Sequence, residues 1–454
     1  MTSIPKTLLF ASLVLTAAPV LAETPLHQRI DALINARAPG KTAGSASDSE
    51  FLRRASLDLN GIIPTAAEVR AFLSDGDSEK RAKRIDALIA APEYARRMRE
   101  AFTVMLLERR TGNATPAEDW NAFLESSFAA NKPWDQFTRE LFQADAADEK
   151  TRGAVKFFVD GGRADHDQMT RDVARLFLGM NIHCAKCHDH PDVDQFKQAD
   201  YFGLLAYLNQ SKSAKHAKLQ RMFLVETAKA AKLEFESVFD PGNKQETGPR
   251  LPGGKTVEIP AIEKGQEFAE PPADGLPGVP KFQPRRLLAA HLTEASNRRF
   301  VENAVNRFWF LMMGRGLVHP LDMLHAENPA SHPKLLALLA DEFVAHKFDV
   351  QYLLREIALS AAYQRSSVLP EGVSERDAPP HAYRVANAKG LTPEQTAWSM
   401  MRAAGVLEEI LKKPPAKDSK FNLKDYVNGR IPTPDNFGDA AKLFVAVFGN
   451  PPGE

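Results

Sequence analysis

Two cysteines and a histidine lie within five positions of the sequence, in the segment Cys184-Ala185-Lys186-Cys187-His188. Two cysteines at this spacing can form thioether bonds to a haem, and the adjacent histidine can then bind the iron through its imidazole. The segment therefore predicts one covalently attached haem c, held by Cys184 and Cys187, with His188 as the proximal iron ligand. The chain contains no third cysteine, so no other thiol competes for attachment.

The same segment allows two other kinds of site. Zinc or another transition metal could be held by Cys184 and Cys187 together with His188 or His190. The cysteines could instead form a disulfide, either inert or redox-active. A redox-active CxxC pair is expected in a βαβ setting, which the helical pattern around this segment does not supply. Both alternatives stay open from the sequence alone.

A haem bound by one histidine has a second axial position, and its occupant determines the chemistry. His190 follows His188 too closely to reach the opposite side of a haem. Remote donors are more plausible as the second ligand, and five are considered: Met169, Met180, His166, His325 and His332. A second protein ligand would favour electron transfer, whereas an open position would favour reactions of peroxide or another small molecule.

Three aspartates follow the CxxCH segment, namely Asp189, Asp192 and Asp194. A carboxylate can accept a hydrogen bond from a ligating imidazole and so orient the ring. We interpret most of these aspartates as solvated turn residues. His190 could donate a hydrogen bond to one of them and brace the turn.

Residues 1–22 have the pattern of a secretory signal peptide. Lys6 provides the positive charge, residues 8–20 are apolar but too few to cross a bilayer comfortably, and Ala22 ends an acceptable cleavage site. We expect cleavage after Ala22 and a periplasmic or secreted product without a membrane span. This location agrees with the haem prediction, because c-type haem is attached outside the bacterial cytoplasm.

The composition is that of a folded globular protein, with 454 residues, 44% of them hydrophobic, and 58 basic and 58 acidic side chains. This charge balance provides no general attraction to nucleic acid or to anionic membranes. We therefore expect a locally recognised partner, here a periplasmic redox partner. The sequence shows no Gly-rich phosphate loop, HExxH motif or Ser/His/Asp triad, so whether the protein is an enzyme stays open.

Hydrophobic periodicity predicts a mainly α protein with two helical domains. The first covers residues 23–210 and contains the CxxCH segment. Residues 211–281 are rich in strand formers and then in proline and glycine, which indicates a small β element followed by a linker. The second helical domain covers residues 282–454, with a last apolar run at 441–448. Helix caps are expected at Thr65 with Glu68, at Ser331 and at Asp349.

One predicted helix carries a row of polar side chains. Arg299, Asn303 and Asn306 recur at helical spacing on one face. Buried Asn and Arg side chains must be hydrogen-bonded, so we favour a structural role in tying helices together. The alternative is a cleft lined by Arg299, Asn303 and His332, which would be the first place to look for activity on an extracellular polymer.

Several motifs occur together and are distinctive as a set. The N-terminal motifs are residues 57–65 (LDLNGIIPT), 184–191 (CAKCHDHP) and 201–203 (YFG). The C-terminal motifs are residues 305–309 (VNRFW), 314–318 (GRGLV), 331–333 (SHP) and 360–367 (SAAYQRSS). The first set resembles the planctomycete cytochrome-c-like domain of secreted proteins, and the second resembles its usual C-terminal companion domain.

The resemblance covers roughly residues 45–450 and implies a shared fold. The family has no established biochemical role, so the haem prediction still depends mainly on the CxxCH spacing. The chain departs from the family pattern at Asp192, where an aromatic residue is usual. It also stops at Glu454, where family members usually continue, so we expect a short variant or a truncated reading frame.

The function expected from the sequence is that of an exported haem c protein, which transfers electrons to or from a periplasmic partner. One alternative is a haem-free binding or scaffold module with a structural Cys/His metal site. The other is a polymer-active extracellular enzyme.

Overall fold

The computed structural model describes residues 24–37, 40–110, 112–160, 165–405 and 407–408. The predicted signal peptide and the apolar run at 441–448 lie outside these residues. The described part of the chain contains fifteen α-helices and six short strands, so the prediction of a mainly α protein is confirmed. None of its helices combines the length and the apolar character needed to cross a membrane.

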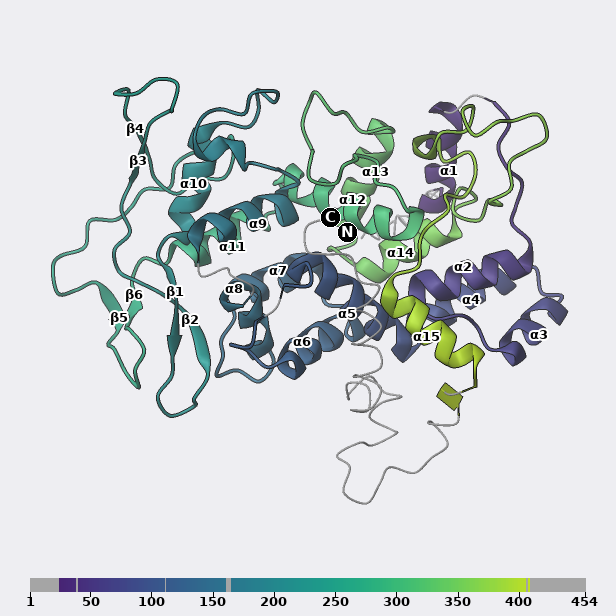
Figure 1. Ribbon diagram of the computed structural model, residues 1–454, viewed down its shortest axis with the longest axis horizontal. Coiled ribbons are helices and arrows are strands. Elements are labelled where there is room, and N and C mark those ends of the chain that lie inside the picture. The colour runs from purple at the N-terminus through teal and green to yellow at the C-terminus, as the bar shows by residue number, and fades with distance from the viewer. Residues whose placement is uncertain (1–23, 38–39, 111, 161–164, 406, 409–454) are drawn as a thin grey trace, which may run out of the picture.

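The N-terminal part of the chain forms ten α-helices and two short 3-10 turns (Figure 1). Their bounds are α1 Leu26–Arg37, α2 Asp48–Asn60, α3 Ala66–Ser74, α4 Lys80–Ala90, α5 Pro92–Leu107, α6 Ala117–Ala129, α7 Trp134–Phe142, η1 Arg152–Val155, α8 Lys156–Val159, α9 His166–Leu178, η2 Cys184–Lys186 and α10 Gln198–Leu208. The predicted capping box is confirmed at α3, where the Thr65 side chain accepts from the Glu68 backbone N–H at 3.2 Å and Glu68 accepts from the Thr65 backbone N–H at 2.8 Å.

Three small antiparallel hairpins follow and lie at one end of the molecule (Figure 1). They pair β1 Ser211–Lys215 with β2 Met222–Glu226, β3 Leu233–Phe235 with β4 Gln245–Thr247, and β5 Phe268–Glu270 with β6 Val279–Pro280. The expected β element and linker are therefore a run of separate two-stranded sheets. Their shortness limits how much apolar surface they can bury, and the helices supply most of the core.

The C-terminal part returns to helices, with bounds α11 Pro284–Leu292, α12 Arg298–Met313, α13 Pro333–Ala345, α14 Val350–Leu359, η3 Pro380–Ala382 and α15 Pro393–Ala403. The predicted cap of α14 is confirmed, because the Asp349 side chain accepts from the Tyr352 backbone N–H at 2.8 Å. The predicted Ser331 cap is wrong. His332 occupies the cap position of α13 without a side-chain bond, and the Ser331 hydroxyl lies 3.1 Å from the His332 ring Nδ1 instead.

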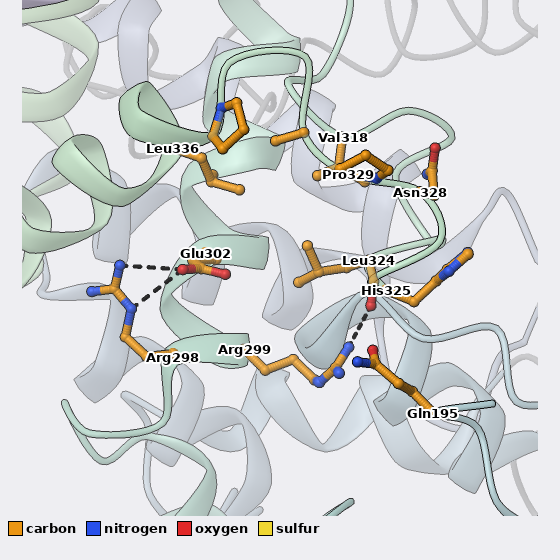
Figure 2. A pocket seen from close by; sticks show the side chains of 12 residues that line it. Gln195, Arg298, Arg299, Glu302, Val318, Leu324, His325, Asn328, Pro329 and Leu336 are labelled. Carbon is orange, nitrogen blue, oxygen red and sulfur yellow. Dashed lines mark hydrogen bonds and ion pairs between the residues drawn. The ribbon is translucent and has the colours of Figure 1, made fainter. Parts of the chain in front are cut away.

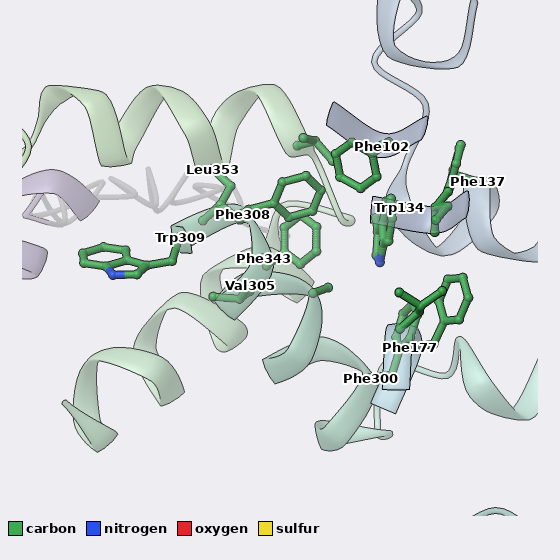
Figure 3. Packing of buried hydrophobic residues seen from close by; sticks show 14 of the residues in the cluster. Phe102, Trp134, Phe137, Phe177, Phe300, Val305, Phe308, Trp309, Phe343 and Leu353 are labelled. Atoms are coloured by element: carbon green, nitrogen blue, oxygen red, sulfur yellow. The ribbon is translucent and has the colours of Figure 1, made fainter. Parts of the chain in front are cut away.

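Helices from the two parts of the chain share one hydrophobic core, which runs from Leu26 to Tyr383. Helix α12 lies within it and contacts α9, α13 and α14. Figure 3 shows Phe308 of α12 among aromatic rings from both parts, with ring centroids 5.6 Å from Phe102, 5.3 Å from Trp134 and 6.1 Å from Phe343. The arrangement as two separate domains is therefore not confirmed.

A buried polar cluster also joins the two parts. The Asp58 carboxylate on α2 accepts from Lys389 Nζ at 2.5 Å and from the Tyr363 hydroxyl at 2.9 Å. Arg54, one turn earlier on α2, donates to the Tyr363 carbonyl at 2.6 Å. The motifs at residues 57–65 and 360–367 are therefore in contact, and they form part of the structural seam between the two helical parts.

Candidate functional site

The CxxCH segment forms a tight turn between α9 and α10. Helix α9 ends at Leu178 and is capped by Gly179, whose φ of 64° lies in the left-handed region that glycine adopts at little cost. The backbone N–H groups of Cys187 and His188 then donate to the Cys184 carbonyl at 3.2 and 3.4 Å. Cys184 and Cys187 are free and exposed, so both thiols can be reached from solvent.

The His188 ring is held in one tautomer by a local hydrogen bond. Its Nδ1 lies 2.6 Å from the backbone carbonyl oxygen of Asp189. A carbonyl oxygen can only accept, so Nδ1 carries the proton and Nε2 keeps its lone pair. A metal-binding histidine characteristically donates its other ring N–H to a carbonyl or carboxylate in this way. The arrangement leaves Nε2 as the nitrogen able to bind iron or another metal.

The segment after β3 is fastened against this turn. Gln198 is buried, and its side-chain amide donates to the carbonyls of Glu236 at 3.0 Å and Lys186 at 3.3 Å. The Val238 backbone N–H donates to the Cys187 carbonyl at 3.0 Å. These bonds place the Phe239 ring 4.8 Å from the His188 ring, although 78% of Phe239 is exposed. Val238 and Phe239 therefore form an exposed apolar surface beside the cysteines.

The neighbouring acidic and histidine side chains follow the expectations from the sequence only in part. The Asp189 carboxylate accepts from the Gln198 backbone N–H at 2.8 Å, at the start of α10. The His188 ring is oriented by the Asp189 backbone carbonyl and not by this carboxylate. Asp192 and Asp194 are exposed, as expected of solvated turn residues. His190 braces the turn as an acceptor, because its Nδ1 receives the Asp192 backbone N–H at 3.1 Å.

The five candidates for a second axial ligand lie in different surroundings, and His332 is buried beside Tyr383. Met169 and Met180 are buried in the core. The His166 ring lies 2.7 Å from the Ser211 carbonyl, which draws it toward β1. His325 is connected to the turn through an aromatic contact, since the Phe196 ring lies 5.7 Å from His190 and 5.5 Å from His325. These contacts do not select a second ligand.

The same side chains, Cys184, Cys187 and His188, would hold either cofactor. Within the described residues, no group of three or more His, Cys, Asp and Glu side chains is arranged to hold a metal ion. The residues do fit a thioether-bound haem in three respects: both thiols are accessible, the His188 Nε2 has its lone pair, and an apolar surface lies alongside.

The polar row on α12 has the structural role that we favoured. The Asn303 side chain donates to the Leu176 carbonyl of α9 at 2.8 Å. The Asn306 amide makes a two-way bond with the Val318 backbone, donating at 2.9 Å and accepting at 3.0 Å. These bonds fix the position of α12 against α9 and the following loop.

One pocket of the described residues is lined by Arg299 (Figure 2), whereas Asn303 and His332 are buried and are not among its lining residues. The three side chains considered for polymer chemistry therefore do not line this pocket together. The sequence reasoning also missed Arg307 on the same helix, which donates to the Arg175 carbonyl at 2.7 Å and pairs with Asp322. Arg307 directly follows Asn306 in the sequence, and this position could have indicated that Arg307 also takes part in the polar contacts of α12.

His332 is a buried titratable group between α13 and the neighbouring loop. It is 4% exposed, and its ring centroid lies 5.6 Å from that of Tyr383. Burial lowers the pKa of His332 to about 4, and the charges of Arg37 and His381 act in the same direction. The folded protein therefore keeps this imidazole neutral under mildly acidic conditions.

This pKa predicts a loss of stability in acid. The unfolded chain takes up a proton at His332 near its ordinary pKa of about 6.5, whereas the folded chain resists protonation. The contribution of the neutral His332 ring to the free energy of unfolding is thus present at neutral pH and decreases as the pH falls through 6.5 toward 4. In the wild-type protein, this effect should lower the free energy of unfolding by about 2 kcal/mol between about pH 7 and 4.5. We expect the His332→Gln variant to lack this part of the pH dependence.

Urea unfolding of both proteins at the two pH values measures this difference. His346→Gln serves as a matched control, because the His346 side chain is 42% exposed. Equal pH dependence of wild type and His332→Gln would contradict the prediction.

The fold and the turn define a class: a mainly helical protein in which two modules share a core and one presents a CxxCH turn. Residues 29–213 match the family model PSCyt2, described as a protein of unknown function (DUF1549), and residues 284–438 match PSD1, described as a protein of unknown function (DUF1553). The two together are typical of planctomycete proteins. No curated protein and no solved structure gives a significant match.

Proposed function

We propose that this protein carries one haem c on Cys184 and Cys187, with His188 as the proximal iron ligand, and transfers electrons to or from a protein partner outside the cytoplasm. The observation that carries this proposal is the hydrogen bond from His188 Nδ1 to the Asp189 carbonyl at 2.6 Å. It fixes the ring in the tautomer that iron ligation requires, on the same turn as two exposed thiols.

Attachment needs only the thiols and the two vinyl groups of the haem. Each Sγ–H adds across one vinyl group, so that a C–S bond forms and the hydrogen ends on the other vinyl carbon. No oxidant is consumed, provided that Cys184 and Cys187 remain reduced. The bound iron supplies a one-electron change between its ferrous and ferric states.

The protein residues would then control the position and surroundings of the group. The Asp189 carbonyl holds the His188 ring, and Gln198 holds the turn itself through the Lys186 carbonyl. Val238 and Phe239 offer apolar surface beside the attachment site. A site on an exposed turn favours exchange of electrons with another protein, because the partner can approach it closely.

Export of the full chain in a bacterium that attaches c-type haem tests this proposal. We expect one haem per chain that survives denaturation, detected by intact mass and by a reduced-minus-oxidised absorption spectrum. The double variant Cys184→Ala, Cys187→Ala should lose the bound mass and the spectrum. His188→Ala should keep covalent haem but shift the absorption bands, because only the axial ligand changes.

His346→Gln is the matched histidine control and should leave the spectrum unchanged. The His346 side chain is partly exposed and lies at the C-terminal cap of α13. Colourless wild-type protein with the mass of the polypeptide alone would overturn the proposal. Stoichiometric zinc without iron would replace it with the haem-free binding or scaffold module.

A further inference from the structure

An apolar surface, formed by Val238 and Phe239, is held in solvent directly beside the CxxCH turn. Val238 is 60% exposed, and Phe239 is more exposed still. The segment that carries them is ordered: the Ser237 hydroxyl accepts from the Phe239 backbone N–H at 3.2 Å, and the Ser237 carbonyl accepts from the Asp240 backbone N–H at 3.0 Å. Adjacent large apolar side chains that are fixed in an exposed position indicate a contact surface.

Acidic side chains flank this apolar surface, and we call four of them the acidic rim: Asp192, Asp194, Glu236 and Asp240. The first two lie on the loop that follows the CxxCH turn, and the other two precede and follow the apolar pair in the chain. All four are exposed, and none has an ion-pair partner among the described residues. The hydrogen bonds that Glu236 and Asp240 accept come from neutral groups, so both keep their full charge.

The basic side chains nearby do not cancel the charge of the acidic rim. Each lysine of the turn, of the loop to α10 and of the β3–β4 hairpin is paired with a carboxylate outside the rim. These pairs are Lys186–Asp167, Lys197–Asp189, Lys232–Glu246 and Lys244–Glu234. Asp167 also pairs with Arg171 at 3.1 Å, which leaves one positive charge there against the four negative charges of the rim. The apolar surface therefore lies in a locally negative field, although the whole chain has 58 basic and 58 acidic side chains.

This charge determines what can cover the apolar surface. A second copy of the chain would bring two acidic rims face to face, and an anionic membrane would repel the rim, so neither is complementary. A protein with an apolar centre and a lysine- or arginine-rich rim would meet opposite charge. A small apolar centre inside a charged rim also suits a short-lived complex, the class to which transient redox pairs belong.

We infer that the apolar surface of Val238 and Phe239, together with the acidic rim, is the docking site for a basic redox protein. The Val238 backbone N–H donates to the Cys187 carbonyl at 3.0 Å, and the Phe239 ring lies 4.8 Å from the His188 ring. A partner docked here would thus meet the attachment site at close range. The redox character of the partner rests on the proposed function, whereas the docking contacts need no haem.

Binding of mitochondrial cytochrome c, a basic haem protein, to the immobilised full chain tests this inference. Its lysine-acetylated form is the matched probe, because acetylation removes the positive charges. Biolayer interferometry gives the association and dissociation rates. We expect saturable binding of the native probe, which weakens about tenfold between about 20 and 200 mM salt, and affinity for the acetylated probe that is about tenfold lower at low salt.

Variants test the two parts of the surface separately. Phe239→Ser should weaken binding of native cytochrome c about tenfold, mainly through faster dissociation. The double variant Glu236→Gln, Asp240→Asn should slow association about threefold and reduce its salt dependence. All three side chains are exposed, so these variants should fold as the wild type does.

Two matched controls come from the segment after α14, which packs against α1, at the other end of the molecule from β3 and β4 (Figure 1). Val368→Ser replaces another exposed apolar side chain, and the double variant Glu371→Gln, Glu375→Gln neutralises two exposed acids. Both controls should bind native cytochrome c as the wild type does.

Wild-type chain produced without haem separates this inference from the proposed function, and it should show the same preference for the native probe. Absence of saturable binding, equal affinity for the acetylated probe, or an unchanged affinity in Phe239→Ser would overturn the docking site even in a protein that carries haem. Colourless protein from the haem-attaching host that nevertheless binds with this preference would overturn the haem, and with it the redox character of the partner, but not the docking surface.

Discussion

Replacement of Asp58 by alanine is expected to lower the free energy of unfolding by about 3–5 kcal/mol, as for other buried ion pairs that lose one partner. The Asp58 side chain is 6% exposed, and it pairs with Lys389 and with the Tyr363 hydroxyl. Burial lowers the pKa of Lys389, and Asp58 counteracts this effect. Without the carboxylate, the Lys389 ammonium, whose side chain is 23% exposed, would remain partly buried without a counter-charge.

Urea unfolding near neutral pH measures this loss. Asp86→Ala is the matched control, because Asp86 pairs with Arg355 at the surface and its side chain is 50% exposed, so its loss should cost no more than about 1 kcal/mol. The double variant Asp58→Leu, Lys389→Met should recover part of the stability, since it removes both charges. An Asp58→Ala protein as stable as the control would contradict the interpretation of this cluster.

Phe308→Ala is expected to cost about 3–5 kcal/mol, the usual penalty for truncating a buried phenylalanine. Phe308 is 1% exposed, and the cavity that it would leave is bordered by Phe102 and Trp134 from the N-terminal part and by Phe343 from the C-terminal part. Both parts should therefore be destabilised together, although only a C-terminal residue is changed.

Hydrogen exchange of the amides in α5 and α13 distinguishes one cooperative core from two domains. We expect the slowest amides of both helices to lose the same amount of protection in Phe308→Ala. Leu73→Ala serves as a control, because Leu73 is 49% exposed. Loss of protection confined to α13 would show that the two parts unfold separately.

Local features of this fold could be predicted from the sequence because their causes are local. The Thr65 capping box and the Asp349 cap each need only residues three positions apart. The Ser331 cap failed for an equally local reason. Pro333 starts α13 and moves the cap position to His332, one residue beyond the serine.

Long-range features could not be predicted in this way. A single sequence gives no means of pairing Asp58 with Lys389, or Asn303 with Leu176, because the partners are far apart in the chain. The shared core was missed for the same reason, since periodicity identifies an apolar helix face but not the helix that covers it. At the candidate site, the spacing drew attention to Cys184, Cys187 and His188, whereas the carbonyl that orients His188 depends on the backbone path of the turn.

The seam between the two parts has a consequence for biosynthesis. The Asp58–Lys389 pair joins positions 331 residues apart, and the Ala46 backbone N–H donates to the Gln364 carbonyl. As the chain leaves the ribosome, its first helices can pack against one another but therefore lack their C-terminal partners until almost all of the described residues have been made. Contacts of this range are slow to form, so the nascent chain should depend on holding chaperones, and a fragment of the first 210 residues should aggregate.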